Sequence, residues 1–345
     1  MKIGRSLQAL LLAGLFALAA DGSALGDERG STPAAPVNEE VLYKFCSRGY
    51  LNSCTDGGVP VDRGGLVMDE AGNLYGTNIY GGGNHKGTVF RLTPTDTGWS
   101  ETVLYNFSGD RGPQTGLIMD AAGNLYGTNQ TGDGSGSYGY GYVYRLAPSD
   151  SGWVYNVLYS FCALSNCADG MTPYGLTIDQ AGNLYGVTYG GYTSDSIVQP
   201  NVFKLAPTGN GWTETVLYRF CSLPNCADGD APLDRLLMGG TGNLYGTTCY
   251  GGGSNSGIVF KLSPTSSGWT ETVLYSFCLQ AHCADGALPN GLLMDSSGNL
   301  YGTTQSGGIY NPSFGGYGTV FKLTATDTGW ERNGSVCLLP EKRLR

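Results

Sequence analysis

A five-fold repeat constrains the fold of this chain more than any other feature of its sequence. A segment of the form GLxMDxxGNLYGT occurs five times, in Gly65–Thr77, Gly116–Thr128, Gly175–Thr188, Leu236–Thr248 and Gly291–Thr304. Its tyrosines recur at intervals of 51, 59, 60 and 56 residues, and all five tryptophans fall at one equivalent place, directly after a glycine. A period of this length indicates one supersecondary unit used several times.

Each repeat contains four segments that we expect to form strands. Two flank the tight turn of the repeated segment, the third has the form VFKL, and the fourth runs from the tryptophan onward, as in Trp269–Phe277. Short segments rich in Val, Tyr, Phe and Thr, separated by Gly, Pro and Asp, are typical of all-β proteins. The 57 glycines among 345 residues also disfavour helices. The sequence predicts an all-β fold, a five-bladed β-propeller of four-stranded blades.

The two ends of the repeat region suggest how the propeller closes. The last repeat keeps its Trp330, but ERNGSVCLLP stands where ETVLYSF is expected. The missing type of segment precedes the first repeat, at Val41–Phe45. We therefore expect this N-terminal strand to complete the fifth blade, because a closed ring leaves no exposed sheet edge. An open array and a truncated larger ring are the alternatives.

The N-terminus resembles a secretory signal. Lys2 and Arg5 precede an apolar stretch, Leu7–Ala20, that is shorter than the ~20 residues of a membrane span. We expect the protein to be secreted, extracellular or at the cell surface, with an uncleaved N-terminal helix as the alternative. The expected regions are a signal peptide over 1–20 with cleavage as late as 26, a flexible leader over 21–38, the propeller over 39–330 and a divergent tail over 331–345.

Eight of the ten cysteines agree with export, because they form four local pairs, each just after a VLYxF segment. The expected disulfides are Cys46–Cys54, Cys162–Cys167, Cys221–Cys226 and Cys278–Cys283. The second repeat lacks both cysteines and has a shorter loop. Two cysteines that are present or absent together are typical of a disulfide. Zinc is disfavoured, since C-x₄-C is not the usual spacing and only His85 and His282 are available. We assign no metal site and no cofactor.

The charge of the chain excludes some partners. A net charge of −9 makes nucleic acid an unfavourable partner, because phosphate contacts need a basic surface, and it disfavours anionic membranes. We expect a monomer without a transmembrane segment.

Two sets of aspartates repeat in register. The first lies in the tight turns, where an Asx-type cap is the favoured interpretation and a ring of catalytic or calcium-binding carboxylates the alternative: Asp69, Asp120, Asp179 and Asp295, with Gly239 in the fourth repeat. The second set precedes the first strand of each repeat: Asp56, Asp110, Asp169, Asp228 and Asp285. If that strand is innermost, these carboxylates are candidates to bind a cation or a polyol at a channel mouth, with turn capping again as the alternative.

The loops between the second and third strands vary in sequence and are rich in Gly, Ser, Asn and Tyr. In a propeller they share one face, where tyrosines provide large contact area with a polar group and favour sugar or peptide binding. The candidate ligand-binding tyrosines are Tyr80, Tyr138, Tyr140, Tyr189, Tyr192, Tyr250, Tyr310 and Tyr317. Solvated loops with scattered aromatic residues are the alternative.

No catalytic residue is assigned from the sequence. A triad needs a histidine in a suitable setting, and no G-x-S-x-G motif occurs. Glycosidases place two carboxylates in unequal settings, whereas the acids here repeat in register. The favoured function is a secreted, non-catalytic binding or scaffold propeller that recognises a polysaccharide or a surface protein through its variable Tyr- and Gly-rich loops. The alternatives are a carbohydrate-active hydrolase or lyase that uses channel carboxylates, and a purely structural surface role.

The combined pattern DGxxPxxGLxxDxxGNLYGTT–GG–GTVFKL–GW–VLYxF, over roughly residues 41–330, resembles the GloVer-type (choice-of-anchor) tandem repeat family. The hairpin alone is also similar to NHL and regulator-type propeller repeats. The resemblance implies secretion and a propeller-like fold, and it implies no established activity. The chain departs from the family pattern at Gly239 and in ERNGSVCLLPEKRLR, which has no recognisable anchor.

Overall fold

The computed structural model describes residues 39–46, 54–61, 65–109, 112–132, 139–194, 196–308, 316–326 and 329–337. Every described strand lies within Leu42–Arg345. The expected signal peptide and leader lie outside the described residues. None of the helical turns in the described part of the chain has the length and hydrophobicity of a membrane span.

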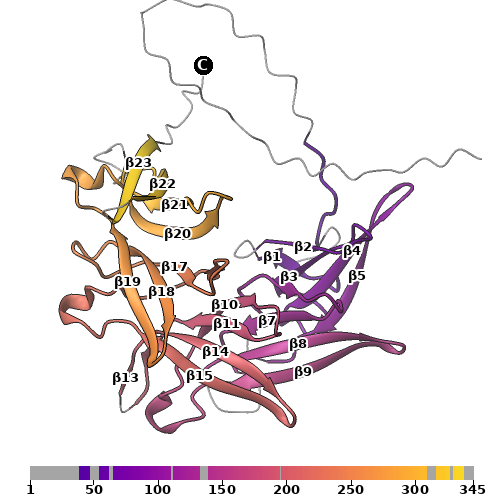
Figure 1. Cartoon of the computed structure of the whole chain (residues 1–345). Coiled ribbons are helices and arrows are strands. Elements are labelled where there is room, and N and C mark those ends of the chain that lie inside the picture. The colour runs from indigo at the N-terminus through magenta and orange to yellow at the C-terminus, as the bar shows by residue number, and fades with distance from the viewer. Residues whose placement is uncertain are drawn as a thin grey trace, which may run out of the picture. The chain divides into compact units, whose positions relative to one another are not determined.

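Five antiparallel sheets of one design contain nearly all the described strands (Figure 1). The first sheet holds β1 (Gly58–Pro60), β2 (Val67–Met68), β3 (Leu74–Tyr80), β4 (Thr88–Thr95) and β5 (Gly98–Asn106). The second holds β6 (Ile118–Met119), β7 (Leu125–Asn129), β8 (Tyr142–Ser149) and β9 (Gly152–Ser160). The third holds β10 (Pro173–Ile178), β11 (Leu184–Thr188), β14 (Asn201–Thr208) and β15 (Gly211–Arg219).

The fourth sheet holds β16 (Leu237–Met238), β17 (Leu244–Thr248), β18 (Ile258–Thr265) and β19 (Gly268–Ser276). The fifth holds β20 (Ala287–Met294), β21 (Leu300–Ser306), β22 (Thr319–Thr326) and β23 (Gly329–Cys337). Strand order in space follows strand order in the chain, and in the first sheet β1 and β2 both pair with β3. The all-β fold of four-stranded antiparallel sheets is therefore confirmed.

The tight turn of each repeat is held by its aspartate, as the Asx interpretation predicts. Oδ1 of Asp69 accepts hydrogen bonds from the amides of Ala71 and Asn73, and Oδ2 accepts from Asn73 Nδ2 and the Tyr75 hydroxyl. The same four contacts recur around Asp120, Asp179 and Asp295. The Asn and Tyr of the repeated N-L-Y sequence thus donate the hydrogen bonds that close the turn, in addition to favouring a strand.

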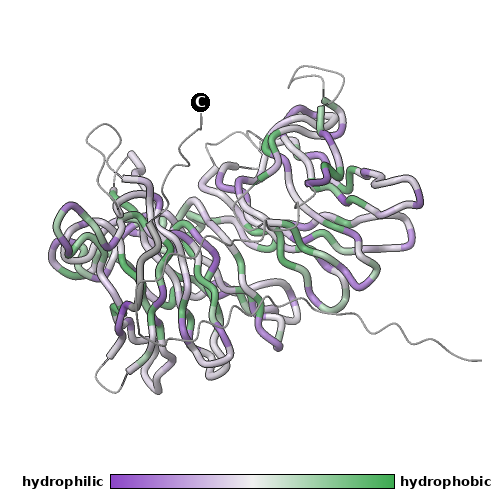
Figure 2. The backbone as a smooth tube through the Cα atoms, turned by 90° about the horizontal axis from the view of Figure 1, so that it is seen from above, coloured by the Kyte–Doolittle hydropathy of each residue, from purple (hydrophilic) through white to green (hydrophobic). Residues whose placement is uncertain are grey.

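The hydrophobic core lies between neighbouring sheets. One cluster joins Tyr75 and Val89 of the first sheet to Leu117, Leu125 and neighbouring residues of the second repeat. Equivalent clusters join the second sheet to the third, the third to the fourth and the fourth to the fifth. In Figure 2 the apolar stretches follow the strands, and hydrophilic stretches gather at many of the turns. Both faces of an inner sheet are therefore buried.

The prediction that Val41–Phe45 completes the fifth sheet is wrong. β23 pairs with β22 from Thr319↔Cys337 to Thr326↔Gly329, so the divergent C-terminal sequence supplies the fourth strand itself. Phe45 instead packs on Phe90 of the first sheet, with ring centroids 4.7 Å apart. The Gly-Trp start of β23 sets the register, and backbone pairing does not require the ETVLYSF side chains. Residues 331–337 consequently belong to the last sheet rather than to a tail.

Two kinds of element were not expected from the sequence. The loop of the third repeat contains an extra hairpin of β12 (Gly191–Tyr192) and β13 (Ile197–Val198). Single 3₁₀ turns occur at three disulfides: η2 (Ser165–Cys167), η3 (Pro224–Cys226) and η4 (Ala281–Cys283).

Candidate functional site

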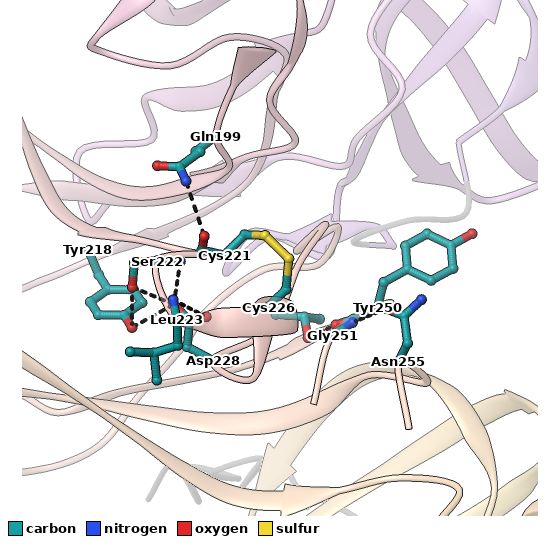
Figure 3. The surroundings of a disulfide bond; sticks show 11 residues. Gln199, Tyr218, Cys221, Ser222, Leu223, Cys226, Asp228, Tyr250, Gly251 and Asn255 are labelled. Carbon is teal, nitrogen blue, oxygen red and sulfur yellow. Dashed lines mark hydrogen bonds between the residues drawn. A yellow bond between two sulfur atoms is a disulfide. The ribbon is translucent and has the colours of Figure 1, made fainter. Parts of the chain in front are cut away.

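The four disulfides predicted from the sequence are present. Each closes a short loop just before the first strand of a repeat, and we call these segments the disulfide loops. Figure 3 shows the loop of Cys221 and Cys226. These loops carry the second set of aspartates and, on their outer side, part of a pocket.

The second set of aspartates is built into the disulfide loops. Asp228 has no solvent exposure, and its carboxylate accepts hydrogen bonds from the Tyr218 hydroxyl, the Ser222 amide and hydroxyl, and the Leu223 amide (Figure 3). Although burial opposes it, these donors lower the pKa of Asp228. Equivalent carboxylates are held in the same way: Asp169 by Tyr159, Ala163 and Leu164, Asp285 by Tyr275, Leu279 and Gln280, and Asp56 by Tyr43 and Cys46. The geometry favours turn capping for this set, and Asp110 lies outside the described residues.

Three of the candidate tyrosines, and not the whole set, come together. Tyr189, Tyr192 and Tyr250 line a pocket of about 810 Å³ beside the β12–β13 hairpin. Tyr80, Tyr140 and Tyr317 are not among its lining residues, and Tyr138 and Tyr310 lie outside the described residues. We call this hollow the tyrosine pocket. Its lining residues are Asn166, Cys167, Ala168, Tyr189, Gly191, Tyr192, Ile197, Val198, Gln199, Pro200, Arg219, Cys221, Asp230, Ala231 and Tyr250.

The hairpin forms an exposed apolar wall of the pocket. Tyr192 is 80% exposed and Ile197 is 73% exposed, although both are large hydrophobic residues. The base includes two disulfide loops, and Gln199 Nε2 donates a 3.1 Å hydrogen bond to the carbonyl of Cys221 (Figure 3). A hollow lined by aromatic and apolar side chains with a few polar groups is typical of small-molecule sites.

Two charged side chains, Arg219 and Asp230, line the pocket. Asp230 and Tyr250 exchange backbone hydrogen bonds of 2.9 and 3.0 Å, so their side chains project from directly opposite positions. Burial, and then the charges of Tyr250 and Asp230, raise the pKa of Tyr189, so this hydroxyl keeps its proton at neutral pH. The pocket therefore offers one carboxylate, one guanidinium and the hydroxyls of three tyrosines.

Both charged residues break the repeat. The positions equivalent to Asp230 hold Gly58, Met171 and Ala287, and those equivalent to Arg219 hold Lys44, Asn106, Ser160 and Ser276. The expectation from sequence missed both, because it followed residues that repeat in register. Departure from the register is the signal that identifies them.

No metal centre accompanies this pocket. Within the described ranges, no group of three or more His, Cys, Asp or Glu side chains is arranged to hold a metal ion.

Comparison with known proteins gives a fold likeness and a family. No curated protein matches the chain. Among solved structures, a proposed oxidoreductase (glucose dehydrogenase) from Thermus thermophilus is 16% identical with a TM-score of 0.45, and the match covers 79% of this chain and 87% of that one. Periplasmic gluconolactonase of Pseudomonas aeruginosa is 13% identical with a TM-score of 0.45, and the match covers 78% and 69%. No residue role is transferred from either structure.

The expectation of a non-catalytic binding or scaffold propeller is corrected on this comparison. Both solved structures carry the names of enzymes, a glucose dehydrogenase and a gluconolactonase, and neither name describes a non-catalytic binding protein. The candidate tyrosines were also expected to share one face. Three of them instead line one pocket, which includes a carboxylate and a guanidinium at positions that do not repeat.

The repeat itself assigns the chain to a family. The family model of the Gloeobacter/Verrucomicrobia repeat matches residues 40–223 and 133–333, which together reach into all five sheets. The chain is a member of the Gloeobacter/Verrucomicrobia repeat family.

Proposed function

We propose that the protein is an enzyme that acts on a carbohydrate, as a hydrolase or a lyase, in the tyrosine pocket. The observation that carries the proposal is the convergence of Asp230, Arg219 and Tyr189 on one hollow, the first two at positions where every other repeat has a different residue. Aromatic side chains supply flat apolar area for sugar rings, and the polar groups supply hydrogen bonds to hydroxyls.

Asp230 is the proton-transfer group of this proposal. It is the one carboxylate among the residues that line the pocket, and it is half-buried beside Tyr250. A carboxylate that accepts a proton from the substrate or from water contributes roughly 10²–10⁴-fold to a rate. Tyr189, which keeps its proton, is the matching donor to a leaving oxygen. The buried carboxylates of the disulfide loops, in contrast, are occupied by donors of the chain.

The test is a panel of neutral and acidic polysaccharides with release of new reducing ends as the readout. Asp230→Asn is expected to lower the rate on the active substrate about a hundredfold or more. Asp150→Asn, in an exposed turn between β8 and β9, is the matched control and keeps the rate. Cleavage of no polysaccharide, or equal rates for Asp230→Asn and the control, contradicts the proposal.

We also propose that the five sheets are the blades of a five-bladed propeller, closed by packing of the fifth sheet on the first. Val320 is 40% exposed, whereas its four equivalents, among them Val89, are 0% exposed. Leu66 is 50% exposed, whereas the equivalent Leu117 is 1% exposed. Val89 and Leu117 share one hydrophobic cluster, so Val320 and Leu66 are the matching halves of a fifth junction.

We also propose that the protein is exported, and the disulfides support this proposal. Disulfides form and persist mainly in oxidising compartments, so four of them support a secreted or surface protein. N-terminal sequencing of the protein recovered outside the cell tests removal of the expected signal peptide over residues 1–20 or as far as 26.

A further inference from the structure

We propose that Arg219 selects a carboxylated sugar, a uronate, in the tyrosine pocket. This inference rests on the proposed function, which assigns the pocket to carbohydrate, and it names the substrate class.

Arg219 is fixed at the wall of the pocket by its backbone and by its guanidinium. It is the last residue of β15, paired with Asn201 of β14, and its Nη2 donates a hydrogen bond to the carbonyl of Ala168. Ala168 itself lines the pocket. Anchoring through one donor orients a group that has five donors in a planar fork, the geometry that pairs with both oxygens of a carboxylate.

The positive charge of Arg219 is not cancelled within its own strand. Glu214, five residues earlier on β15, is the acid whose pKa responds to Arg219. Burial, and then the charge of Asp169, raise the pKa of Glu214 to about 7, against the opposing effect of Arg219. A carboxyl group that is partly protonated at neutral pH neutralises the guanidinium of Arg219 only in part.

The repeat shows that the fold does not need this arginine. Serine occupies the equivalent position at the end of the outer strand in the second and fourth sheets, at Ser160 and Ser276, and a disulfide loop follows in both. The arginine occurs only where the extra β12–β13 hairpin adds a second wall to the pocket. In a chain with net charge −9, an anionic ligand needs such a local cation to bind.

A bound uronate would also decide between the two reactions. With its carboxylate on Arg219, the adjacent C5–H is acidified, and Asp230 takes that proton. The C5–H electron pair forms the C4=C5 double bond, the C4–O bond breaks, and the leaving oxygen takes the proton of Tyr189. Asp230 then returns its proton to Tyr189 through solvent, so the enzyme is restored without a co-reactant. The substrate class therefore points to the lyase.

The test is isothermal titration with uronate trisaccharides and their methyl esters. Trimers of galacturonate, glucuronate and mannuronate cover the common ring stereochemistries, and esterification removes only the charge. The free acid of the preferred trimer is expected to bind roughly tenfold or more tightly than its ester, as charge-assisted hydrogen bonds predict. Added salt is expected to weaken binding of the acid and leave binding of the ester unchanged.

Variants assign the preference to Arg219. Arg219→Gln is expected to make the affinities for acid and ester equal, and Arg219→Lys to keep part of the preference, because it retains the charge but not the fork. Lys261→Gln on β18 changes the net charge equally, lies outside the pocket lining and keeps the full preference.

Equal affinities for acid and ester in the unaltered protein overturn selection by Arg219 while leaving a sugar site in place. An undiminished preference in a folded Arg219→Gln variant has the same consequence. If Arg219→Gln does not fold, the lysine variant decides. The inference is overturned if Arg219→Lys keeps the full preference for the acid, or if Arg219→Lys and Lys261→Gln lose the same share of that preference. Binding of neither acids nor esters by the unaltered protein overturns both this inference and the proposed function.

Discussion

The hydroxyl of Tyr218 donates a 2.9 Å hydrogen bond to Oδ2 of Asp228, a carboxylate with no solvent exposure. The tyrosine belongs to the outer strand of the third sheet, and the aspartate lies just before the fourth. The pair therefore joins consecutive repeats through the disulfide loop between them. Tyr159 with Asp169 and Tyr275 with Asp285 repeat the contact at 2.8 and 3.0 Å.

Removal of this carboxylate is expected to destabilise the protein strongly. Asp228→Ala leaves the Tyr218 hydroxyl and the amides of Ser222 and Leu223 without their acceptor, at about 3 kcal/mol in the free energy of unfolding. Tyr218→Phe removes one hydrogen bond and is expected to cost about 1 kcal/mol. Urea unfolding measures both, and Asp150→Ala in an exposed turn is the control. An Asp228→Ala variant as stable as the control contradicts a structural role for the second set of aspartates.

Stability is expected to fall as the pH rises from about 5 to about 8. Burial, and then the charge of Asp228, raise the pKa of Glu271 from 4.5 to about 7, and burial with Asp56 does the same for Glu101. The folded protein thus binds more protons than the unfolded chain between pH 4.5 and 7, so stability present below that window is lost as pH rises through it. The turn aspartates, whose pKa values are lowered, act in the opposite direction only at lower pH.

The melting temperature at the two pH values measures this effect, with Glu271→Gln as the matched variant. The variant is expected to lose less stability than the unaltered protein, because its side chain cannot ionise. Identical pH dependence in the two proteins would show that Glu271 keeps an ordinary pKa.

The disulfide beside the pocket is expected to matter for both stability and ligand binding. The Cys221→Ser/Cys226→Ser variant opens a loop with a sequence separation of 5, for which chain entropy predicts a loss of about 2 kcal/mol. Its loop forms part of the base of the tyrosine pocket. Cys278→Ser/Cys283→Ser opens a loop of equal separation away from the pocket lining. Calorimetry and titration are expected to show similar melting losses but weaker sugar binding only in the first variant, and equal binding in both contradicts the placement of the site.

Much of the fold follows from the sequence because the interactions that define it are local. The turn around Asp69 is closed by a side chain six residues further on, each disulfide closes a short loop, and Gly, Pro and Asp mark the breaks between strands, so all were predictable from the repeat. The fourth strand of the fifth sheet was not, since β23 is held by backbone pairing with β22 while its sequence diverges.

The site was only partly predictable for a different reason. Tyr189, Tyr192 and Tyr250 stand out by composition, but their pocket forms between consecutive repeats and depends on a hairpin with no repeat counterpart in the described part of the chain. Asp230 and Arg219 lie at positions where the pattern is interrupted, so an argument from register passes over them.

Closure of the ring is expected to bring Leu66 and Val320 into contact. In a Leu66→Cys/Val320→Cys variant, oxidation is expected to form an intramolecular disulfide, because the equivalents of these residues share a core cluster. Peptide mapping of the oxidised monomer detects the bond. Val154→Cys/Val320→Cys, with an exposed outer-strand residue as its first site, is the control without a cross-link. Cross-linked dimers in place of monomers would mean that the two faces pair between molecules.

The most direct test of the account is a crystal structure of Asp230→Asn with a bound uronate trisaccharide. We expect electron density for the sugar between Tyr189, Tyr192 and Tyr250, with its carboxylate on the guanidinium of Arg219. Density for the sugar at any other surface, with the tyrosine pocket empty, would contradict it.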